Sequence, residues 1–164
     1  MIYNLRVDER MIHGQILVSW LKFLGVSSII VANDRAATDP IEKLALSTAV
    51  PANIKCLIST MADTLTILND PRAKDKKIMV ITENIFDANE IVKAIEDVRE
   101  VVIGNYGNIY KSNILNKKVL SRFVRVDEED IACLIEMRKE LDARNIPFYI
   151  SNVSTDKKIY LSNL

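Results

Sequence analysis

The chain has 164 residues, of which 49% are hydrophobic, and its 22 Lys and Arg residues balance 22 Asp and Glu residues. This length, with apolar residues spread along it, favours one domain, residues 1–164, with a buried core. A net charge near zero argues against a nucleic-acid partner, which would need a concentrated basic surface. No apolar run reaches the length of a membrane span, and the first residues lack the features of a signal peptide.

The cysteines and the histidine bound the chemistry further. Cys56 and Cys133 lie far apart, each in an apolar segment, and His13 is the sole histidine. This pattern predicts two reduced, buried cysteines in a cytosolic protein rather than a disulfide. With one histidine and no close cysteine pair, no metal site is expected.

Strand-like and helix-like stretches alternate along the first part of the chain. An apolar run at 3–7 predicts a strand, and residues 13–24 predict a helix that ends at Gly25. β-branched residues predict a second strand at 28–32. Asp39 and Pro40 suit the N-cap and the first position of a helix that reaches about residue 49. A third strand is expected at 54–58.

The alternation continues in the second part. The predicted elements, in order, are a helix capped by Ser59 or Thr60 through 68, a strand at 77–81, a helix capped by Asp87 through 95, and a strand at 100–103. Residues 119–126 predict one strand with no helix before it, and such a strand would pair antiparallel. The acidic run 127–130 opens a helix through 143, and the last strand is expected at 148–150.

Repeated β-α-β units predict an α/β fold. We expect an open, mainly parallel, doubly wound sheet with helices on both faces and an antiparallel strand near the C-terminal part. Ligands of such sheets bind beyond the carboxyl ends of the strands. The loop at 8–14 follows the first strand and is therefore expected at that edge. The same edge should carry Asn33-Asp34, Thr82-Glu83-Asn84 and Gly104-Asn105.

His13 lies where the first strand gives way to the first helix, in the segment Arg6-Val7-Asp8-Glu9-Arg10-Met11-Ile12-His13-Gly14-Gln15. The positive end of a helix disfavours imidazolium, so we expect a neutral ring with one nitrogen free to attack. The same helix end would stabilise an anion attached to the ring. The alternative is an ordinary structural histidine that is hydrogen-bonded at a helix start.

Two arginines and an aspartate precede His13 and are candidates for holding an anion. Arg10 carries a fork of donors that suits phosphate oxygens, unless it is a surface arginine paired with Asp8 or Glu9. Arg6, near the strand end, is a weaker candidate. Asp8 would orient Arg10 or the imidazole, or simply cap the loop.

The residues that follow His13 offer softer signals. Gly14 would let the backbone approach a bound group, and Gln15 would add a polar contact, although a turn and an exposed helix start explain them equally well. Trp20 is expected in the core with Ile16 and Phe23. The chain has no GxxxxGK[ST] loop, no GxGxxG fingerprint and no GxSxG elbow.

The segment 6–15, followed by Trp20, resembles the active-site segment of IIB components of the bacterial phosphoenolpyruvate-dependent sugar phosphotransferase system, in the mannose/fructose/sorbose family. The family pattern is close to R-[IV]-D-[DE]-R-[LM]-I-H-G-Q. Softer similarity runs through 29–34 to 153–156, so the resemblance covers essentially the whole chain. Two departures are Glu9, where Asp is frequent, and Gly104-Asn105-Tyr106-Gly107, where a Gly-Gly pair often follows the fifth strand.

The resemblance implies a phosphocarrier. His13 would accept a phosphoryl group from a separate IIA protein and pass it to a sugar held by membrane IIC and IID subunits. The loop backbone, Arg10 and Asp8 would surround the phosphate, with no metal or organic cofactor. A cytoplasmic protein that meets the inner face of the membrane through IIC and IID is implied, and members of the family are often homodimers.

Two further points stay open at the level of sequence. A non-catalytic α/β regulatory module, whose His13 loop binds an anion without being modified, is the alternative function. Met11 and Ile12 are expected to help form a docking surface for IIA and the membrane subunits. Met11 is the better surface candidate, since Ile12 could equally pack inward.

Overall fold

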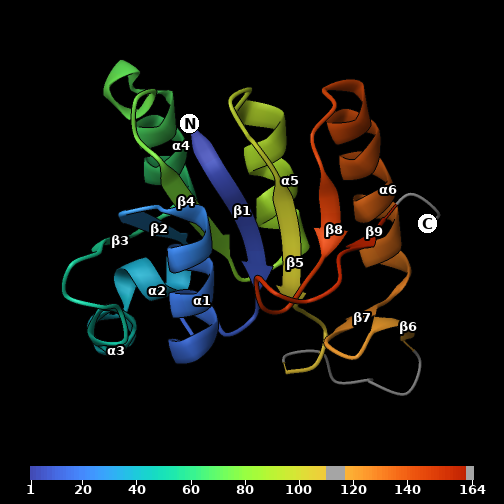
Figure 1. Cartoon of the computed structure of the whole chain (residues 1–164), viewed down its shortest axis with the longest axis horizontal. Helices are drawn as coiled ribbons and strands as arrows, with labels where there is room; N and C mark the ends of the chain where they lie inside the picture. Colours follow the sequence, from blue (N-terminus) through green and yellow to red (C-terminus); the bar gives the residue numbers. More distant parts are fainter. Residues whose placement is uncertain (110–116, 162–164) are drawn as a thin grey trace.

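The computed structural model describes residues 1–109 and 117–161, except the side chains of Gln15 and Ile16 (Figure 1). Its centre is a seven-stranded sheet in the order β3-β2-β4-β1-β5-β8-β9. The strands are β1 (Ile2–Asp8), β2 (Ser28–Ala32), β3 (Lys55–Ser59), β4 (Ile78–Thr82), β5 (Val101–Asn105), β8 (Phe148–Ile150) and β9 (Ile159–Tyr160). All neighbours are parallel except β8 and β9, so the predicted mainly parallel sheet is confirmed.

Helices cover both faces of this sheet. They are α1 (Gly14–Leu24), α2 (Asp34–Thr38), α3 (Pro40–Thr48), α4 (Met61–Asn69), α5 (Ile85–Ala94) and α6 (Glu128–Ala143), with a 3₁₀ turn at Pro71–Ala73. Gly25 ends α1 with a φ of 61°, as the sequence predicts. Asp39 caps α3 by accepting from the N–H groups of Ile41 and Glu42, which confirms that helix start.

Two helix starts differ from the prediction. The N-cap of α5 is Asn84 rather than Asp87, because the Asn84 side chain accepts the N–H of Asp87, which lies in the first turn. The short helix α2 was not predicted. Asn33 caps it by accepting the N–H of Ala36, and a single helical turn has no apolar repeat by which a sequence could reveal it.

Residues 118–126 form a hairpin, so the prediction of one strand was wrong. Strands β6 (Lys118–Ser121) and β7 (Val124–Val126) pair antiparallel in a sheet of their own. The chain turns at 122–123 without the Gly or Asn that usually marks such a turn. The antiparallel strand of the main sheet is instead β9, which is only two residues long.

The strands alternate their side chains between two apolar clusters, one on each face of the sheet. In β4, Val80 packs with α4, α5 and α6, whereas Met79 packs with Leu17 and Trp20 of α1. Trp20 is 1% exposed, as expected of a core residue. Phe23 is 59% exposed, so its predicted place in the core was wrong. Its ring meets the Trp20 ring edge-on from outside, with centroids 6.0 Å apart.

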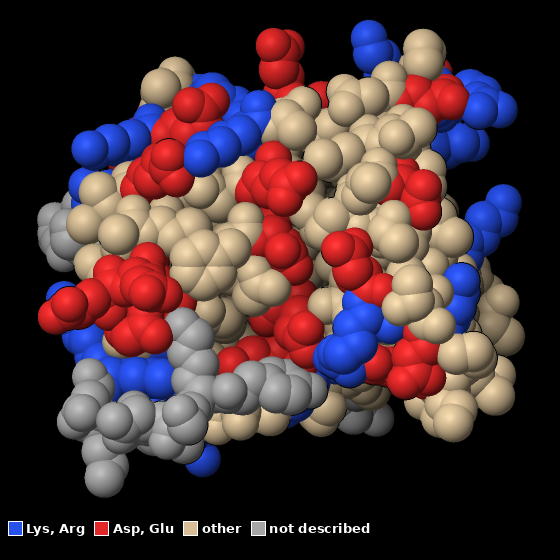
Figure 2. All heavy atoms as spheres, turned by 180° about the vertical axis from the view of Figure 1, so that it is seen from behind, with Lys and Arg blue, Asp and Glu red and all other residues tan. Residues whose placement is uncertain are grey.

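Both cysteines are free thiols, as predicted. Cys133 is buried and Cys56 is partly buried, and burial raises the pKa of both thiols. Viewed from behind, acidic side chains run down the middle of the molecule, and further acidic and basic side chains lie on both sides of them (Figure 2). Within 1–109 and 117–161, no helix is both long and apolar enough to cross a membrane.

Candidate active site

The loop between β1 and α1 places His13 at the carboxyl edge of the sheet, at the lower edge in Figure 1. His13 is the N-cap of α1, with an extended backbone at φ −134°, and its side chain forms no capping hydrogen bond. The side chain is exposed, while the first turn of α1 starts directly behind it. An exposed imidazole at an uncapped helix start is accessible to another molecule and lies at the positive end of the helix dipole.

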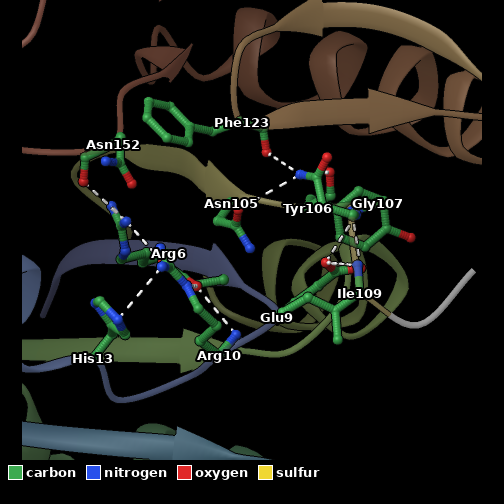
Figure 3. Close-up of polar contacts among 12 residues, drawn as sticks. Arg6, Glu9, Arg10, His13, Asn105, Tyr106, Gly107, Ile109, Phe123 and Asn152 are labelled. Atoms are coloured by element: carbon green, nitrogen blue, oxygen red, sulfur yellow. Dashed lines mark hydrogen bonds and ion pairs between the residues drawn. The ribbon is translucent and has the colours of Figure 1, made fainter. Parts of the chain in front are cut away.

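Arg10 is the charged side chain next to this imidazole. Its Nη1 lies 3.4 Å from Nε2 of His13, and its side chain is 29% exposed (Figure 3). Asp8, which is buried, anchors Arg10 from the other side. One oxygen of its carboxylate accepts the Arg10 backbone N–H at 3.1 Å and lies 3.5 Å from Nε. Arg10 is therefore paired with Asp8, as the alternative interpretation of a surface arginine expects, but its guanidinium also contacts the His13 ring.

Arg6 lies inside the protein rather than at the surface of the site. Its side chain is 2% exposed, and its guanidinium donates to Asp8 at 2.9 Å and to the backbone carbonyls of Ser151 and Asn152. Burial lowers the pKa of Arg6 below its usual value, and the adjacent Asp8 carboxylate opposes that shift. Arg6 thus joins the end of β1 to the loop after β8.

Gly104 and Trp20 enclose that guanidinium. A Cβ atom on Gly104 would lie 1.9 Å from Nη2 of Arg6, so no larger residue fits without moving Arg6. The Arg6 guanidinium carbon is 5.5 Å from the centre of the Trp20 ring, a cation–π contact. Trp20 also donates its indole N–H to the carbonyl of Asn152. The interior position of Arg6 is therefore fixed from several directions.

The expectation that Met11 and Ile12 form a docking surface was wrong. They are 5% and 7% exposed and belong to the apolar cluster around Trp20. A turn closed by the Met11 N–H and the Asp8 carbonyl, 2.8 Å apart, folds this part of the loop inward. Met11 has a φ of 54°, a strained conformation for a residue with a side chain, which the burial of that side chain offsets.

Glu9 has a structural role that the sequence did not reveal. It is 3% exposed, and its carboxylate accepts the backbone N–H groups of Gly107, Asn108 and Ile109 at 2.8, 3.0 and 3.0 Å (Figure 3). Gly107 has a φ of 79°, and a Cβ there would lie 1.8 Å from the Arg125 carbonyl oxygen. In the sequence, Gly107 was the only sign of an unusual loop conformation, and it gave no indication that Glu9 would bind this loop.

The other residues expected at this edge are present there. Asn33 donates to Glu83 at 2.9 Å, and Glu83 pairs with Arg35 at 2.6 Å, so these side chains are engaged with one another beyond β2 and β4. Gly14 is exposed, with open space around its Cβ position. The side chain of Gln15 lies outside the described residues. The described residues contain no group of three or more His, Cys, Asp or Glu side chains that could hold a metal ion.

The protein is an α/β protein with a mainly parallel sheet, and its exposed histidine and partly exposed arginine lie at the carboxyl edge, where such sheets bind their ligands. The family model of the PTS system sorbose subfamily IIB component matches residues 2–164. The chain therefore belongs to this family: it is a IIB component, a phosphotransferase that carries phosphoryl groups in sugar phosphotransfer.

Relatives and solved structures agree with this assignment. A probable phosphotransferase enzyme IIB component of Streptococcus pyogenes is 36% identical over the whole chain and 99% of its own length. The mannose-specific EIIAB component of Escherichia coli K12 is 31% identical over 97% of this chain, which spans only 46% of that protein. The fold matches the IIBSor domain of the Klebsiella pneumoniae sorbose permease with a TM-score of 0.84 at 24% identity, over 98% of this chain and 93% of that one.

Proposed function

We propose that His13 is the phosphoryl carrier of this IIB component, receiving the group from phosphohistidine on a IIA protein and passing it to a sugar held by IIC and IID membrane subunits. The observation that supports this best is the 3.4 Å approach of Arg10 Nη1 to Nε2 of an exposed His13 ring. The name of one relative, a mannose-specific EIIAB component, supports a IIA donor and a sugar as final acceptor. Peripheral association with the membrane and a homodimer remain predictions of the family resemblance.

Each transfer replaces one bond to phosphorus with another. A ring nitrogen of His13 attacks phosphorus while the N–P bond of the donor histidine breaks, and the proton that His13 gives up is balanced by one gained by the donor ring. In the second step a sugar hydroxyl oxygen attacks, the N–P bond to His13 breaks, and the hydroxyl proton replaces the phosphoryl group on the ring. Little further covalent chemistry is needed, so positioning and charge stabilisation account for most of the catalysis.

The surroundings of His13 suit both tasks. The phosphoryl group carries about −1.5 to −2 charges near neutral pH, by analogy with other phosphorylated side chains. Arg10 and the N–H groups at the start of α1 would offset that charge. Gly14 leaves room for the group beside the helix start, since a Cβ there would meet nothing within 4 Å. Gln15 stays a candidate from the sequence.

In the proposed mechanism Asp8 and Arg6 do not touch the phosphate themselves but position Arg10, which does. Asp8 would hold Arg10 toward the ring, and Arg6 would hold Asp8. Arg6 was a candidate phosphate ligand in the sequence, but its guanidinium is 2% exposed and donates to three internal acceptors. We therefore propose a positioning role for it in place of direct contact with phosphate.

The test is phosphorylation by phosphoenolpyruvate, the general phosphotransferase proteins and a cognate IIA. We expect one phosphate per chain, acid-labile and relatively base-stable, that maps to His13. His13→Ala should abolish the label while circular dichroism shows an intact fold. Label on a serine or aspartate, or label that persists in His13→Ala, would sink the proposal. A parent chain that stays unmodified but binds inorganic phosphate would favour the regulatory module instead.

A further inference from the structure

Asn105, the last residue of β5, has a side-chain donor that no residue in the described part of the chain accepts from. Its side chain is 7% exposed, and its Nδ2 atom is buried without a hydrogen-bond partner among residues 1–109 and 117–161. Leaving a buried amide N–H group unpaired costs about 1–3 kcal/mol. Such a group in a native structure needs an explanation, and an acceptor that arrives in a working state of the molecule is one.

The polar groups of Asn105 face different surroundings. The backbone carbonyl of Asn105 accepts the Glu9 N–H at 3.0 Å, and its Oδ1 lies 3.5 Å from Nδ2 of Asn108. In Figure 3 the amide nitrogen of Asn105 points toward the side of the picture on which Arg6 and Arg10 lie, and its oxygen points the other way. The unpaired donor is therefore directed toward the β1 side of Asn105.

The pairing of β1 with β5 places Asn105 next to Asp8 of the candidate site. Asp8 is the register partner of Asn105 across β1 and β5. The backbone N–H of Arg10 is bonded to that same Asp8, and Arg10 reaches His13. Arg10 Nε is a second buried donor for which the described residues supply no hydrogen-bond acceptor, with the Asp8 carboxylate 3.5 Å away. Two unused donors at one sheet edge, beside a histidine, call for a group rich in acceptor oxygens.

We propose that Asn105 binds the phosphoryl group of phosphorylated His13, with its side-chain amide donating to a phosphoryl oxygen. This inference rests on the proposed role of His13 as carrier. Because the Asn105 amide is buried and the His13 ring is exposed, the contact requires the loop that carries His13 to move toward Asn105. Glycine, which is frequent in the family after the fifth strand, would not supply this donor.

The experiment compares Asn105→Gly and Asn105→Asp with the parent, and uses Asn108→Gly as a matched control. Asn108 lies in the loop that follows β5. Its amide donates to the Phe123 carbonyl at 2.8 Å and comes only within 3.5 Å of Asn105 Oδ1. The readouts are the equilibrium partition of phosphate between IIA and this chain, and the pKa of the phosphoryl group by ³¹P NMR. A merely structural role of Asn105 in the loop would not move that pKa.

A donor to the phosphoryl group stabilises its dianion, so Asn105→Gly should raise the phosphoryl pKa. The same variant should shift the partition about ten- to a hundredfold toward IIA, as expected for a lost hydrogen bond to a charged group. Asn105→Asp should shift both further, because its carboxylate repels phosphate. Asn108→Gly should lower the midpoint of thermal unfolding and leave the phosphoryl pKa unchanged.

A folded Asn105→Gly protein with the parent's partition and phosphoryl pKa would overturn the role of Asn105 and leave His13 as carrier untouched. If the parent takes no phosphate from IIA, phosphoramidate as a chemical donor phosphorylates the exposed imidazole directly. The ³¹P titration of that form then decides on Asn105 alone. Failure of both donors to modify His13 would reject the carrier and the Asn105 contact together.

Discussion

At the scale of single residues, Arg10 should support transfer through its charge and its fork geometry together. Removing a preorganised donor at a developing anion typically costs about 2.7–4 kcal/mol, a hundred- to a thousandfold in rate. We expect Arg10→Ala to lose about that much, with Arg10→Lys between it and the parent, because lysine keeps the charge but loses bidentate contact. Rapid-quench transfer from phospho-IIA measures this. If Arg10→Ala transferred phosphate at the parent rate, the loop backbone rather than Arg10 would hold the phosphate.

Gly104 permits a second prediction at this scale. In Gly104→Ala the new methyl group would occupy the place of the Arg6 guanidinium, which then must leave Asp8 and the carbonyls of Ser151 and Asn152. We expect a loss of about 1–3 kcal/mol of unfolding free energy, as for other overpacked sites, with slower transfer. Urea denaturation measures the first effect.

The control for that substitution is Gly14→Ala, where a Cβ would meet nothing within 4 Å. Its unfolding free energy should stay within about 0.5 kcal/mol of the parent. Equal stability of Gly104→Ala and the parent would show that Arg6 is held less firmly than its contacts indicate.

Side-chain placement was the hardest part to predict from sequence. The chain order puts Arg10, Asp8 and His13 in one loop at the correct edge of the sheet, so that grouping followed from topology alone. The burial of Arg6 and Glu9 did not, because it depends on residues 104–109 and 151–152, which are remote in sequence. In a sequence, a charged residue next to a site suggests contact with the ligand. Only the fold shows that its side chain is instead hydrogen-bonded to another part of the chain.

At the scale of elements, α6 depends on its first turn. The Asp127 side chain accepts the Asp130 N–H while the Asp130 side chain accepts the Asp127 N–H, a complete capping box. Asp127→Ala should cost about 0.5–2 kcal/mol of unfolding free energy. Thermal unfolding measures it, with exposed Glu129→Ala as the control from the same turn. Equal midpoints for the two variants would mean that the box contributes nothing.

Elements were predicted well where local chemistry decides them. Buried strands and capped helices announce themselves through apolar runs and through residues such as Asp39, Thr60 and Asp127, all of which are N-caps in the fold. The hairpin at 118–126 and the strand β9 were missed because tertiary pairing decides them. The Tyr106 N–H donates to the Phe123 carbonyl and Tyr106 bridges Val124, which ties the hairpin to the end of β5.

The Glu9 carboxylate joins the loop after β1 to the backbone N–H groups of 107–109, about a hundred residues later in the chain. Glu9→Gln keeps the shape of the side chain but replaces one acceptor oxygen with a donor that faces backbone N–H groups. We expect a loss of about 1–3 kcal/mol, the cost of buried unpaired groups. Hydrogen exchange should show faster exchange at the amides of 107–109. Unchanged protection of these amides would contradict the role of the Glu9 carboxylate in holding them.

At the scale of the whole molecule, one sheet carries both apolar clusters, so both should melt together. Trp20, the sole tryptophan, reports on the α1 face, whereas far-UV circular dichroism reports on all helices, including α4, α5 and α6. We expect the two signals to change at the same urea concentration, as for a two-state domain. Separate transitions would mean that the two faces are independent folding units.

The hydrogen bonds of Arg6 to Ser151 and Asn152 have a consequence for the nascent chain. The acceptor carbonyls of Arg6 lie 145 and 146 positions later in the chain, so they leave the ribosome long after Arg6 does. Until they are synthesised this guanidinium has no interior place, and the β1 end and Asp8 cannot take their final arrangement. A IIB chain that stalls or is cut before residue 151 should therefore be unable to hold Arg10 for transfer. With the proposed role of Arg10, a chain interrupted there would accept little phosphate from IIA, although its His13 segment is already complete.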